Sequence, residues 1–338
     1  MNLLKTCLTF LFLAAGLAGA DPAPAHDLYV CVQLNGDSRV MGARDPNVNG
    51  IYRRTAGGFE HLGLNHPMLL SVSFDPRDHN VIYAATLSGV LRTLDGGQNW
   101  RVTTDWDVTE LKSVVVDSHA PDTVYAGVPD GFIISHDRGF TWTRSESGLP
   151  DRGKYTQVVA VDRAKAGRVF IGCDTGIYLS EDGAKSWRKV FAAAATVDDL
   201  QQSPADPLTW RSVTQADGAL ISHDGGLSWE KLPGVSSDKA LYNLAWDARN
   251  PQRLAISSWA AGLLVSEDGG QTWTTRNAGL PEPARVWRTA IDPDSGRLYA
   301  SIDQQALYVS DDFGRTWTMG GLPGSRVLSF CFVPRKTK

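Results

Sequence analysis

An eight-residue motif recurs along this sequence at a nearly constant interval, and this repetition constrains the fold more than any other feature. Copies begin at Thr93, Ser135, Ser180, Ser222, Ser266 and Ser310. Successive copies are 42, 45, 42, 44 and 44 residues apart. A period of this length is typical of solenoids and propellers. We therefore expect a repeat protein with one supersecondary unit per interval.

The motif, written S/T-x-D-x-G-x-T/S-W, predicts a turn between two strands. Its Asp can accept bonds from neighbouring backbone N–H groups, and its Gly supplies a positive φ. Its Trp is expected to start the next strand and to bury roughly 150–250 Å² against the neighbouring sheet. Ala184 replaces the Gly in one copy, so that turn is expected to differ slightly. The predicted structural residues are Asp95, Trp100, Asp137, Trp142, Asp182, Trp187, Asp224, Trp229, Asp268, Trp273, Asp312 and Trp317.

These eight residues resemble the Asp-box, or BNR repeat, of sialidases, sortilin-type receptors, xyloglucan hydrolases and photosystem II stability/assembly-factor-like propellers. The copies cover nearly the whole mature chain, and the single propellers of the assembly-factor-like and sortilin-like groups are the most similar. In that family the box is a structural hairpin remote from the functional face. The resemblance therefore implies a β-propeller in which the box Asp and Trp residues are structural.

Each repeat contains four strand-like runs, and both the first and the second run of the unit occur seven times. The chain begins on a second run, near residues 28–32, and ends on a first run, at residues 327–332. The C-terminal strand can thus complete the N-terminal blade and leave few exposed edges. We predict an all-β fold over residues 21–338: a seven-bladed propeller of four-stranded antiparallel blades, closed by the C-terminal strand. A degenerate seventh box is expected at residues 54–61, with Ala56 replacing the Asp and His61 the Trp.

The first 20 residues are typical of a secretory signal peptide, with Lys5, an apolar run and Ala-Gly-Ala before Asp21. The run is shorter than the about 20 apolar residues of a membrane span, so we expect a secreted or periplasmic protein without one. The three remaining cysteines are too few for a disulfide-built scaffold. Cys31 and Cys331 are predicted on adjacent strands, where the register decides between a disulfide and two free thiols. Cys173 is expected to be a buried thiol.

Composition and motifs exclude several functions. The formal net charge is −4 and no basic stripe is present, which argues against nucleic-acid binding. The sequence lacks H-E-x-x-H, G-x-S-x-G, the Walker loop, G-x-G-x-x-G and EF-hand spacing. We expect no metal, no cofactor and a monomer.

In propellers, the loops opposite the box turns surround the mouth of the central channel and generally form the binding face. Repeat phase places five binding candidates there: Tyr242, Trp259, Trp287, Arg288 and Trp106. Aromatic rings beside carboxylates suit a sugar or a peptide, although loop Trp residues also pack between blades. Trp210 and Trp246 fall within strands and are expected in the core. Residues 33–49 form the longest insertion, which is either a functional loop or a plain surface insertion.

Two functions fit this pattern. The favoured one is a binding or assembly scaffold with a protein partner or a glycan at the channel mouth. The alternative is a glycoside hydrolase, which needs two carboxyl groups roughly 5–10 Å apart. Asp198, Asp199 and Asp303 are the candidates, although a solvated pair at a strand entrance is the commoner explanation for such residues. Sialidases carry a Phe/Tyr-Arg-Ile-Pro motif, and Tyr52-Arg53-Arg54 lacks its Ile-Pro. Xyloglucan hydrolases resemble two such propellers together, so both differences favour the scaffold.

Overall fold

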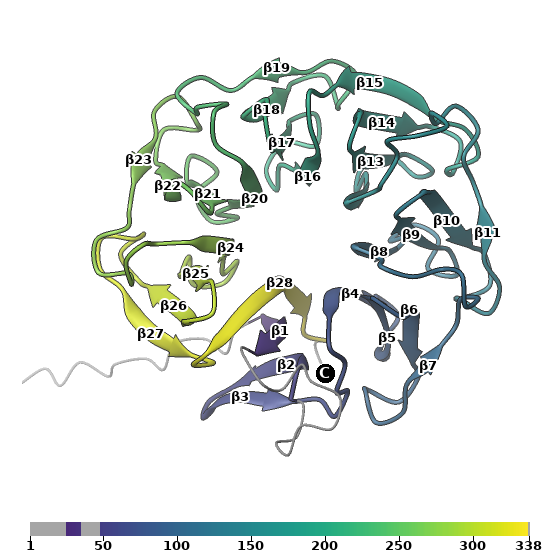
Figure 1. Ribbon diagram of the computed structural model, residues 1–338, viewed down its shortest axis with the longest axis horizontal. Helices are drawn as coiled ribbons and strands as arrows, with labels where there is room; N and C mark the ends of the chain where they lie inside the picture. Colours follow the sequence, from purple (N-terminus) through teal and green to yellow (C-terminus); the bar gives the residue numbers. More distant parts are fainter. Residues whose placement is uncertain (1–24, 35–47, 337–338) are drawn as a thin grey trace, which may run out of the picture.

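The computed structural model describes residues 25–34 and 48–336. The expected signal peptide and most of the insertion at residues 33–49 lie outside these residues. The chain forms seven four-stranded antiparallel sheets arranged as a ring around a central channel (Figure 1). The predicted fold class is confirmed. No helix within the described residues is long and apolar enough to cross a membrane.

Each blade has an inner strand beside the channel and an outer strand at the rim, and its strands follow one another in sequence except in blade 1. Blade 1 comprises β28 (Ser325–Pro334), β1 (His26–Leu34), β2 (Gly50–Thr55) and β3 (Gly58–His61). Blade 2 comprises β4 (Leu69–Asp75), β5 (Asp78–Thr86), β6 (Gly89–Thr93) and β7 (Arg101–Val102). Blade 3 comprises β8 (Ser113–Val116), β9 (Val124–Val128), β10 (Gly131–Ser135) and β11 (Thr143–Arg144). Blade 4 comprises β12 (Val158–Val161), β13 (Val169–Cys173), β14 (Gly176–Ser180) and β15 (Arg188–Ala192). Blade 5 comprises β16 (Val197–Gln202), β17 (Trp210–Thr214), β18 (Ala219–Ser222) and β19 (Glu230–Lys231). Blade 6 comprises β20 (Leu241–Trp246), β21 (Leu254–Ser258), β22 (Gly262–Ser266) and β23 (Thr274–Thr275). Blade 7 comprises β24 (Val286–Ile291), β25 (Leu298–Ile302), β26 (Ala306–Ser310) and β27 (Thr318–Gly321).

The ring closes as predicted, because β28 pairs antiparallel with β1 inside blade 1. In this register Cys31 lies opposite Ser329, and Cys331 lies opposite Tyr29. The two cysteines are therefore diagonal neighbours, and both are free thiols. Of the two alternatives left open by the sequence, the register thus selects the unbonded one. Cys173 is a buried free thiol, as expected.

The box turn is held by its first and third residues, as the copy in blade 6 illustrates. The Ser266 hydroxyl donates to Asp268 Oδ1 at 2.7 Å and accepts the N–H of Gly270 at 2.8 Å. Asp268 also accepts the N–H of Thr272 at 3.0 Å and its hydroxyl at 2.5 Å. The fourth and fifth residues adopt positive φ, at 76° and 94° in this copy. Ala184, at the fifth position, keeps the same conformation with φ 66°, so the expected difference in that turn is absent, and the Cβ of Ala184 adds a strain of about 1–2 kcal/mol.

Each box Trp packs between its own blade and the preceding one, which confirms its role as an inter-blade anchor. Trp142 packs on the cluster shared by blades 2 and 3, and Trp229 on that of blades 4 and 5. Trp187 is 5% exposed, whereas the other box Trp side chains are only half-buried. The outer strands begin one residue after the Trp rather than at it.

Blade 1 lacks the box, and its hairpin corrects the predicted alignment. Thr55 lies opposite Gly58 and Arg54 opposite Phe59, so a tight two-residue turn replaces the longer box loop. Phe59, not His61, packs on the cluster between blades 7 and 1, where other blades place the Trp. The box does not form because Asp is absent and the loop is too short to make the two left-handed residues.

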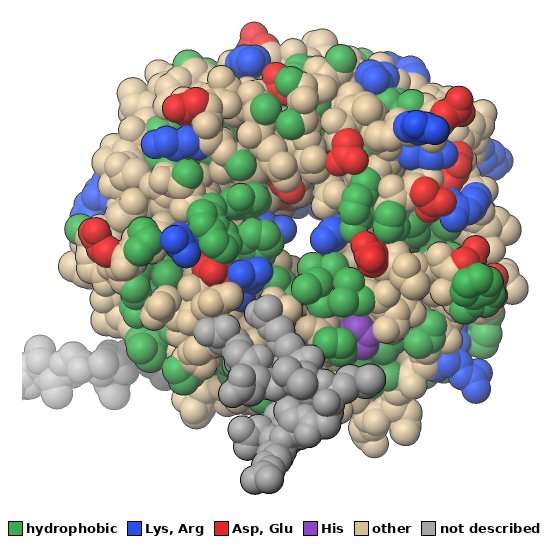
Figure 2. Space-filling model, in the orientation of Figure 1, with side chains coloured by type: hydrophobic (Ala, Val, Ile, Leu, Met, Phe, Trp, Pro, Cys, Tyr) green, Lys and Arg blue, Asp and Glu red, His purple; other side chains and the backbone are tan. Residues whose placement is uncertain are grey.

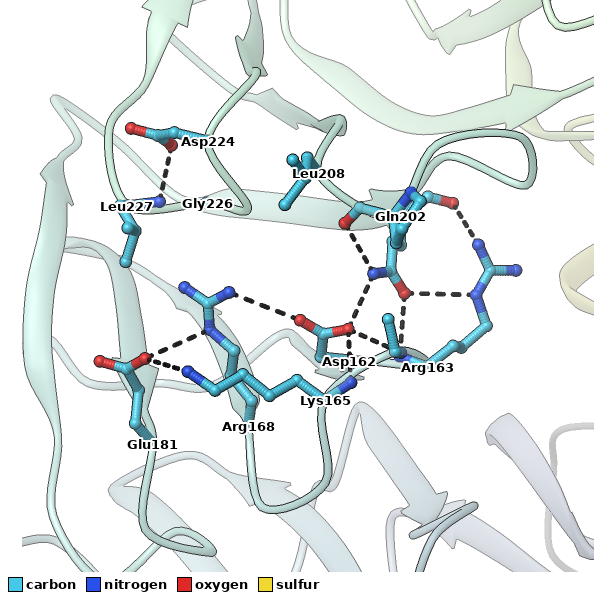
Figure 3. A network of polar contacts seen from close by, with 12 residues as sticks. Asp162, Arg163, Lys165, Arg168, Glu181, Gln202, Leu208, Asp224, Gly226 and Leu227 are labelled. Atoms are coloured by element: carbon cyan, nitrogen blue, oxygen red, sulfur yellow. Dashed lines mark hydrogen bonds and ion pairs between the residues drawn. The ribbon is translucent and has the colours of Figure 1, made fainter.

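The turns between the inner and second strands lie on the same face as the boxes and carry a second set of polar ties. In blade 4, Asp162 Oδ1 accepts from the Gln202 side chain of blade 5 at 2.9 Å. Arg168 lies 3.6 Å from Asp162 and 3.7 Å from Glu181, and Lys165 lies 3.0 Å from Glu181 (Figure 3). Polar contacts therefore link this face both between and within blades, and contacts of this kind occur around the ring.

Candidate functional site at the channel mouth

The mouth of the channel is shaped by a β-bulge at the start of successive inner strands. The pairing register shifts around one extra residue in these strands: Leu70, Asp198, Tyr242, Trp287 and Leu328. A bulge leaves its extra residue unpaired and re-aims the side chain. Three predicted site residues, Asp198, Tyr242 and Trp287, occupy such positions, whereas Leu328 at the bulge of blade 1 is buried.

Aromatic rings and arginines form one stacked array at this mouth. Tyr242 and Trp287 stack with centroids 4.9 Å apart, and Trp259 meets Trp287 edge-on at 5.9 Å. The Arg326 guanidinium lies 4.9 Å from the Trp287 ring centroid and 5.6 Å from that of Trp259. The Arg288 guanidinium lies 5.1 Å from the Trp287 centroid. Each cation–π contact of this kind contributes about 0.5–2 kcal/mol, so the array is preorganised.

Arg285 extends the array, since its guanidinium lies 5.5 Å from the Trp259 ring. Hydrophobic and basic side chains gather beside the central opening, over β20, β21 and β24 (Figure 2). We call Tyr242, Trp259, Trp287, Arg285, Arg288 and Arg326 the arginine–aromatic cluster.

Arg288 departs from a pattern that blades 2, 3, 5 and 6 follow, whereas Val158 of blade 4 and Ser329 of blade 1 also accept no such N–H in the described part of the chain. At the same strand position, Ser71, Ser113 and Asn243 each accept an N–H of the next inner strand, at 3.2, 3.1 and 2.9 Å. A guanidinium cannot accept, and Arg288 instead donates to the carbonyls of Tyr242 and Trp287, at 3.2 and 3.1 Å. Among the described residues, no carboxylate lies within ion-pair distance of Arg288. Burial lowers its pKa, and a buried unpaired cation costs stability.

Asp198 is the carboxylate at the mouth whose environment best suits a general acid. Burial raises its pKa to about 7, opposed by the positive charge of Arg288. Gln215 donates to its Oδ1 at 3.4 Å, while its buried Oδ2 has no hydrogen-bond partner among the described residues. Other charged or titratable groups that act on it are Lys112, Asp174, Asp199 and Tyr242.

Asp199 and Asp303 are both engaged in bonds within the protein. Asp199 accepts the N–H of Leu244 at 3.0 Å in the next blade and that of Leu200 at 2.9 Å. It thus fills the inter-blade acceptor position, and burial raises its pKa. Asp303 is bound by the guanidinium of Arg326 and is 9% exposed. Asp198 differs from both, since its Oδ2 is buried without a hydrogen-bond partner among the described residues.

Other predicted residues lie elsewhere. Trp106 is 92% exposed in the loop between β7 and β8, and no ring or cation contact links it to the cluster among the described residues. Trp210 is fully buried, as expected for the core. Trp246, also assigned to the core, is instead half-buried on the channel wall, where the Arg211 guanidinium lies 4.2 Å from its ring.

Arg285 and Arg326 were not among the site residues predicted from the sequence. Both occupy the same repeat position, two residues before the bulge. Comparing that earlier position across the blades would have found them, since other blades place uncharged residues there apart from Glu110.

A cavity of about 530 Å³ opens along the channel wall formed by β16, β20, β24 and β28. It runs from Asp198 and Arg288 at the mouth toward Pro204 and Phe332 at the opposite end. Asp198 and Asp199 are the only acidic residues among its described lining. Within the described residues, no group of three or more His, Cys, Asp or Glu side chains could hold a metal.

Comparison with known proteins agrees with this architecture. The family model of the photosynthesis system II assembly factor YCF48 matches residues 58–208, and that of the BNR/Asp-box repeat matches residues 308–319. The chain is an Asp-box (BNR-repeat) β-propeller. Among curated proteins, this Asp-box propeller is 27% identical over 186 residues to the oligoxyloglucan-reducing end-specific xyloglucanase of Emericella nidulans. It is also 27% identical over 201 residues to the xyloglucanase of Hypocrea jecorina. These matches cover 47% and 52% of this chain but only 23% of each relative, so the chain matches less than a quarter of their length.

Two solved structures show the same fold as this Asp-box propeller. The GH74 xyloglucanase of Xanthomonas campestris superposes with a TM-score of 0.68 at 19% identity, covering 81% of this chain and 51% of that one. A structure of YCF48 bound to a D1 peptide superposes with a TM-score of 0.56 at 19% identity, covering 74% of this chain and 81% of that one.

Proposed function

We propose that this Asp-box propeller is an extracytoplasmic binding scaffold that holds an acidic segment of a protein partner at the channel mouth. The observation that carries the proposal is the arginine–aromatic cluster, in which two backbone carbonyls hold Arg288 and no carboxylate of the described residues lies within ion-pair distance of it. Arginine presents several N–H donors in a rigid plane and pairs with carboxylates in bidentate geometry. The signal-peptide-like first 20 residues support the extracytoplasmic location.

A protein segment fits this mouth better than a stacked sugar. The Trp287 ring is already stacked on Tyr242 and contacted by the guanidiniums of Arg288 and Arg326. A sugar would need an open aromatic face, whereas a carboxylate needs only the outward N–H edges of the guanidiniums. Similarity to YCF48, for which a D1 peptide complex is solved, also favours a peptide ligand.

The second candidate function is a glycoside hydrolase acting on a glycan. It is favoured by the xyloglucanase relatives and by Asp198, whose pKa of about 7 suits a general acid. Hydrolysis by the usual mechanism requires a second available carboxylate. Asp199 is committed to backbone N–H groups and Asp303 to Arg326, which makes this candidate weaker.

The proposal is tested by fluorescence anisotropy with a short acetylated and amidated Glu-rich peptide and a matched peptide carrying Gln at each Glu. We expect the Glu peptide alone to bind, with affinity falling as salt rises. Arg288→Ala should weaken binding by about tenfold or more, equivalent to about 1.4 kcal/mol, and Trp287→Ala should weaken it through loss of the stack. Arg101→Ala is the matched control, because Arg101 is exposed on the rim strand β7.

Equal binding of the Glu and Gln peptides, or unchanged binding by Arg288→Ala, would contradict the proposal. Cleavage of xyloglucan oligosaccharides that Asp198→Asn abolishes would instead establish the hydrolase.

A further inference from the structure

The box turns of blades 3, 5, 6 and 7 each lie against a residue in or just before the second strand of the preceding blade. The Tyr83 hydroxyl of blade 2 donates to the Arg138 carbonyl of the blade 3 box at 2.9 Å. The Arg211 guanidinium of blade 5 donates to the Gly269 carbonyl of the blade 6 box at 2.5 Å. The Arg253 guanidinium of blade 6 lies 4.9 Å from the ring of Phe313 in the blade 7 box.

Blades 4 and 5 show how tight this cover is. A Cβ on Gly226 of the blade 5 box would lie 2.5 Å from the Phe170 ring, and one on Gly225 would lie 2.8 Å from Arg168. The turn carrying Gly226 projects over Arg168 (Figure 3). These seams therefore have no room for another group beneath the turn.

The seam between blades 7 and 1 has no box turn over it, because the tight two-residue β2–β3 hairpin takes the place of the box. Tyr299 of β25 holds the position that the covered residues hold in other blades. Tyr299 is itself buried, with the Phe330 and Phe332 rings of blade 1 at 5.8 and 6.4 Å. The Arg54 side chain lies over it, with its Nη1 bonded to the Tyr299 hydroxyl and its guanidinium 5.7 Å from the ring. A pocket of about 520 Å³ opens beside this contact, and its lining includes Arg54, Thr55, Asp292, Ser295, Arg297 and Phe332.

The charges in this pocket favour an incoming carboxylate at one point. Arg297 pairs with Asp311 at 2.6 Å, Arg335 with Asp27 at 2.8 Å, and His26 with Asp294 at 2.8 Å. Asp292 Oδ1 accepts the backbone N–H groups of residues 294 and 295. Among the described residues, no carboxylate lies within ion-pair distance of Arg54. Box turns carry an acid at their second position in three blades, at Glu181, Glu267 and Asp311.

We infer that this pocket, the seam pocket, is a docking site for a β-turn of a partner protein that carries an acidic residue and exposed backbone carbonyls. The seams before blades 3, 5, 6 and 7 define the occupant, since a box turn of the next blade fills each of them. In the complex, the incoming carboxylate pairs with Arg54. The site is on the box face, opposite the channel mouth, and does not depend on the function proposed for the mouth.

The test uses a fluorescent, backbone-cyclised hairpin carrying SEDGGQTW, the sequence of residues 266–273. We expect the hairpin to bind, and its Asp→Ala analogue, which loses the bonds that hold the turn, to bind at least tenfold more weakly. Arg54→Ala should weaken binding by at least tenfold. Arg53→Ala is the matched control, because its neighbouring side chain pairs with the exposed Glu60 instead. Arg288→Ala should leave hairpin binding unchanged, which separates this site from the mouth.

A rebuilt variant provides a second measurement. Replacing residues 54–59 with SEDGGQTW restores a full box, so we expect a higher melting temperature and no hairpin binding. The inference is overturned if the wild-type protein does not bind the hairpin, or if the rebuilt variant binds it as the wild type does. Concentration-dependent dimerisation that Arg54→Ala abolishes would also overturn it, because a second copy of this chain would then be the occupant.

Discussion

The two faces of the ring differ in how strictly they repeat. On the box face, each of six blades uses the same Ser or Thr, Asp and paired left-handed residues, with bonds of nearly equal length. At the channel mouth, the corresponding position changes from Leu70 to Lys112, Asp198, Tyr242 and Trp287 around the ring.

Folding constrains the residues of the box face, whereas the residues at the mouth are free to vary for binding. A repeated turn is required in each blade because it satisfies the same backbone groups each time. The mouth has no such shared requirement, since the extra residue of a bulge makes no ladder bond and its side chain can vary. The Arg288 guanidinium, held by two backbone carbonyls beside the Trp287 ring, therefore points to a ligand rather than to the fold.

The largest effect is expected from removing β28, the strand that closes the ring and on which both faces depend. Deleting the chain from Arg326 onward removes most of β28, the inner strand of blade 1, and exposes the edge of β1. The whole ring should lose its cooperative transition, as measured by circular dichroism during heating. A truncated protein that keeps the wild-type melting temperature would contradict the closure.

The next largest effect is expected from replacing Trp residues on the two faces. Trp187→Ala should lower the free energy of unfolding by about 3–5 kcal/mol, the usual result of emptying an aromatic core site. The half-buried box residue Trp229 should cost less on replacement by Ala, since less of its ring is removed from solvent. Trp287→Ala should change stability less than Trp187→Ala but weaken peptide binding. Denaturant titrations measure the stabilities of the three variants, and fluorescence anisotropy measures peptide binding. If Trp287→Ala were less stable than Trp187→Ala, the division between the two faces would be contradicted.

Acid should weaken the box face through its aspartates. The Ser186 hydroxyl and backbone N–H groups bonded to Asp182 lower its pKa to about 2, and Thr141 does the same for Asp137. A lowered folded pKa means that the stabilisation is present above the unfolded value near 4 and is lost as pH falls toward 2. The free energy of unfolding should therefore decline over this range, less so in Asp182→Ala. An identical decline in that variant would show that the box Asp contributes nothing to it.

The smallest effect is expected at Asp198, and it has the opposite sign. Its folded pKa of about 7 exceeds the unfolded value, so its contribution to stability is present at low pH and is lost as pH rises from about 4 through 7. Ionisation also adds a negative charge beside Arg288, so acidic-peptide affinity should fall a few-fold between pH 6 and 8. Asp198→Asn should bind tightly at both values. If the affinity of the wild type and of the Asp198→Asn variant changed equally with pH, the pH dependence would belong to another group.

Much of the fold followed from the sequence because the repeat fixes its units. The seven blades and the pairing of β28 with β1 were predicted from the offset between first and second strand runs. The diagonal placement of Cys31 and Cys331 was not, because the extra residue Leu328 shifts the register only once the strands pair. The degenerate box predicted in blade 1 was misaligned for a similar reason. The prediction kept the eight-residue length of the motif, whereas the β2–β3 hairpin is two residues shorter.

The candidate site was predicted only in part. Tyr242, Trp259, Trp287 and Arg288 do come together, because bulges and loops at one face converge. The bonds of Asp199 and Asp303 could not be predicted, since they depend on Leu244 of the next blade and on Arg326. Trp106 was placed near the mouth by repeat phase, but loop length carries its ring away from the cluster.

The most direct test measures acidic-peptide affinity and melting temperature together in Arg288→Ala and Asp182→Ala. We predict that Arg288→Ala loses about tenfold or more in affinity, about 1.4 kcal/mol, while its melting temperature stays near the wild-type value. Asp182→Ala should show the reverse, a lower melting temperature with unchanged affinity. If Arg288→Ala binds the peptide as tightly as the wild type, the channel mouth is not the binding site and the account is contradicted.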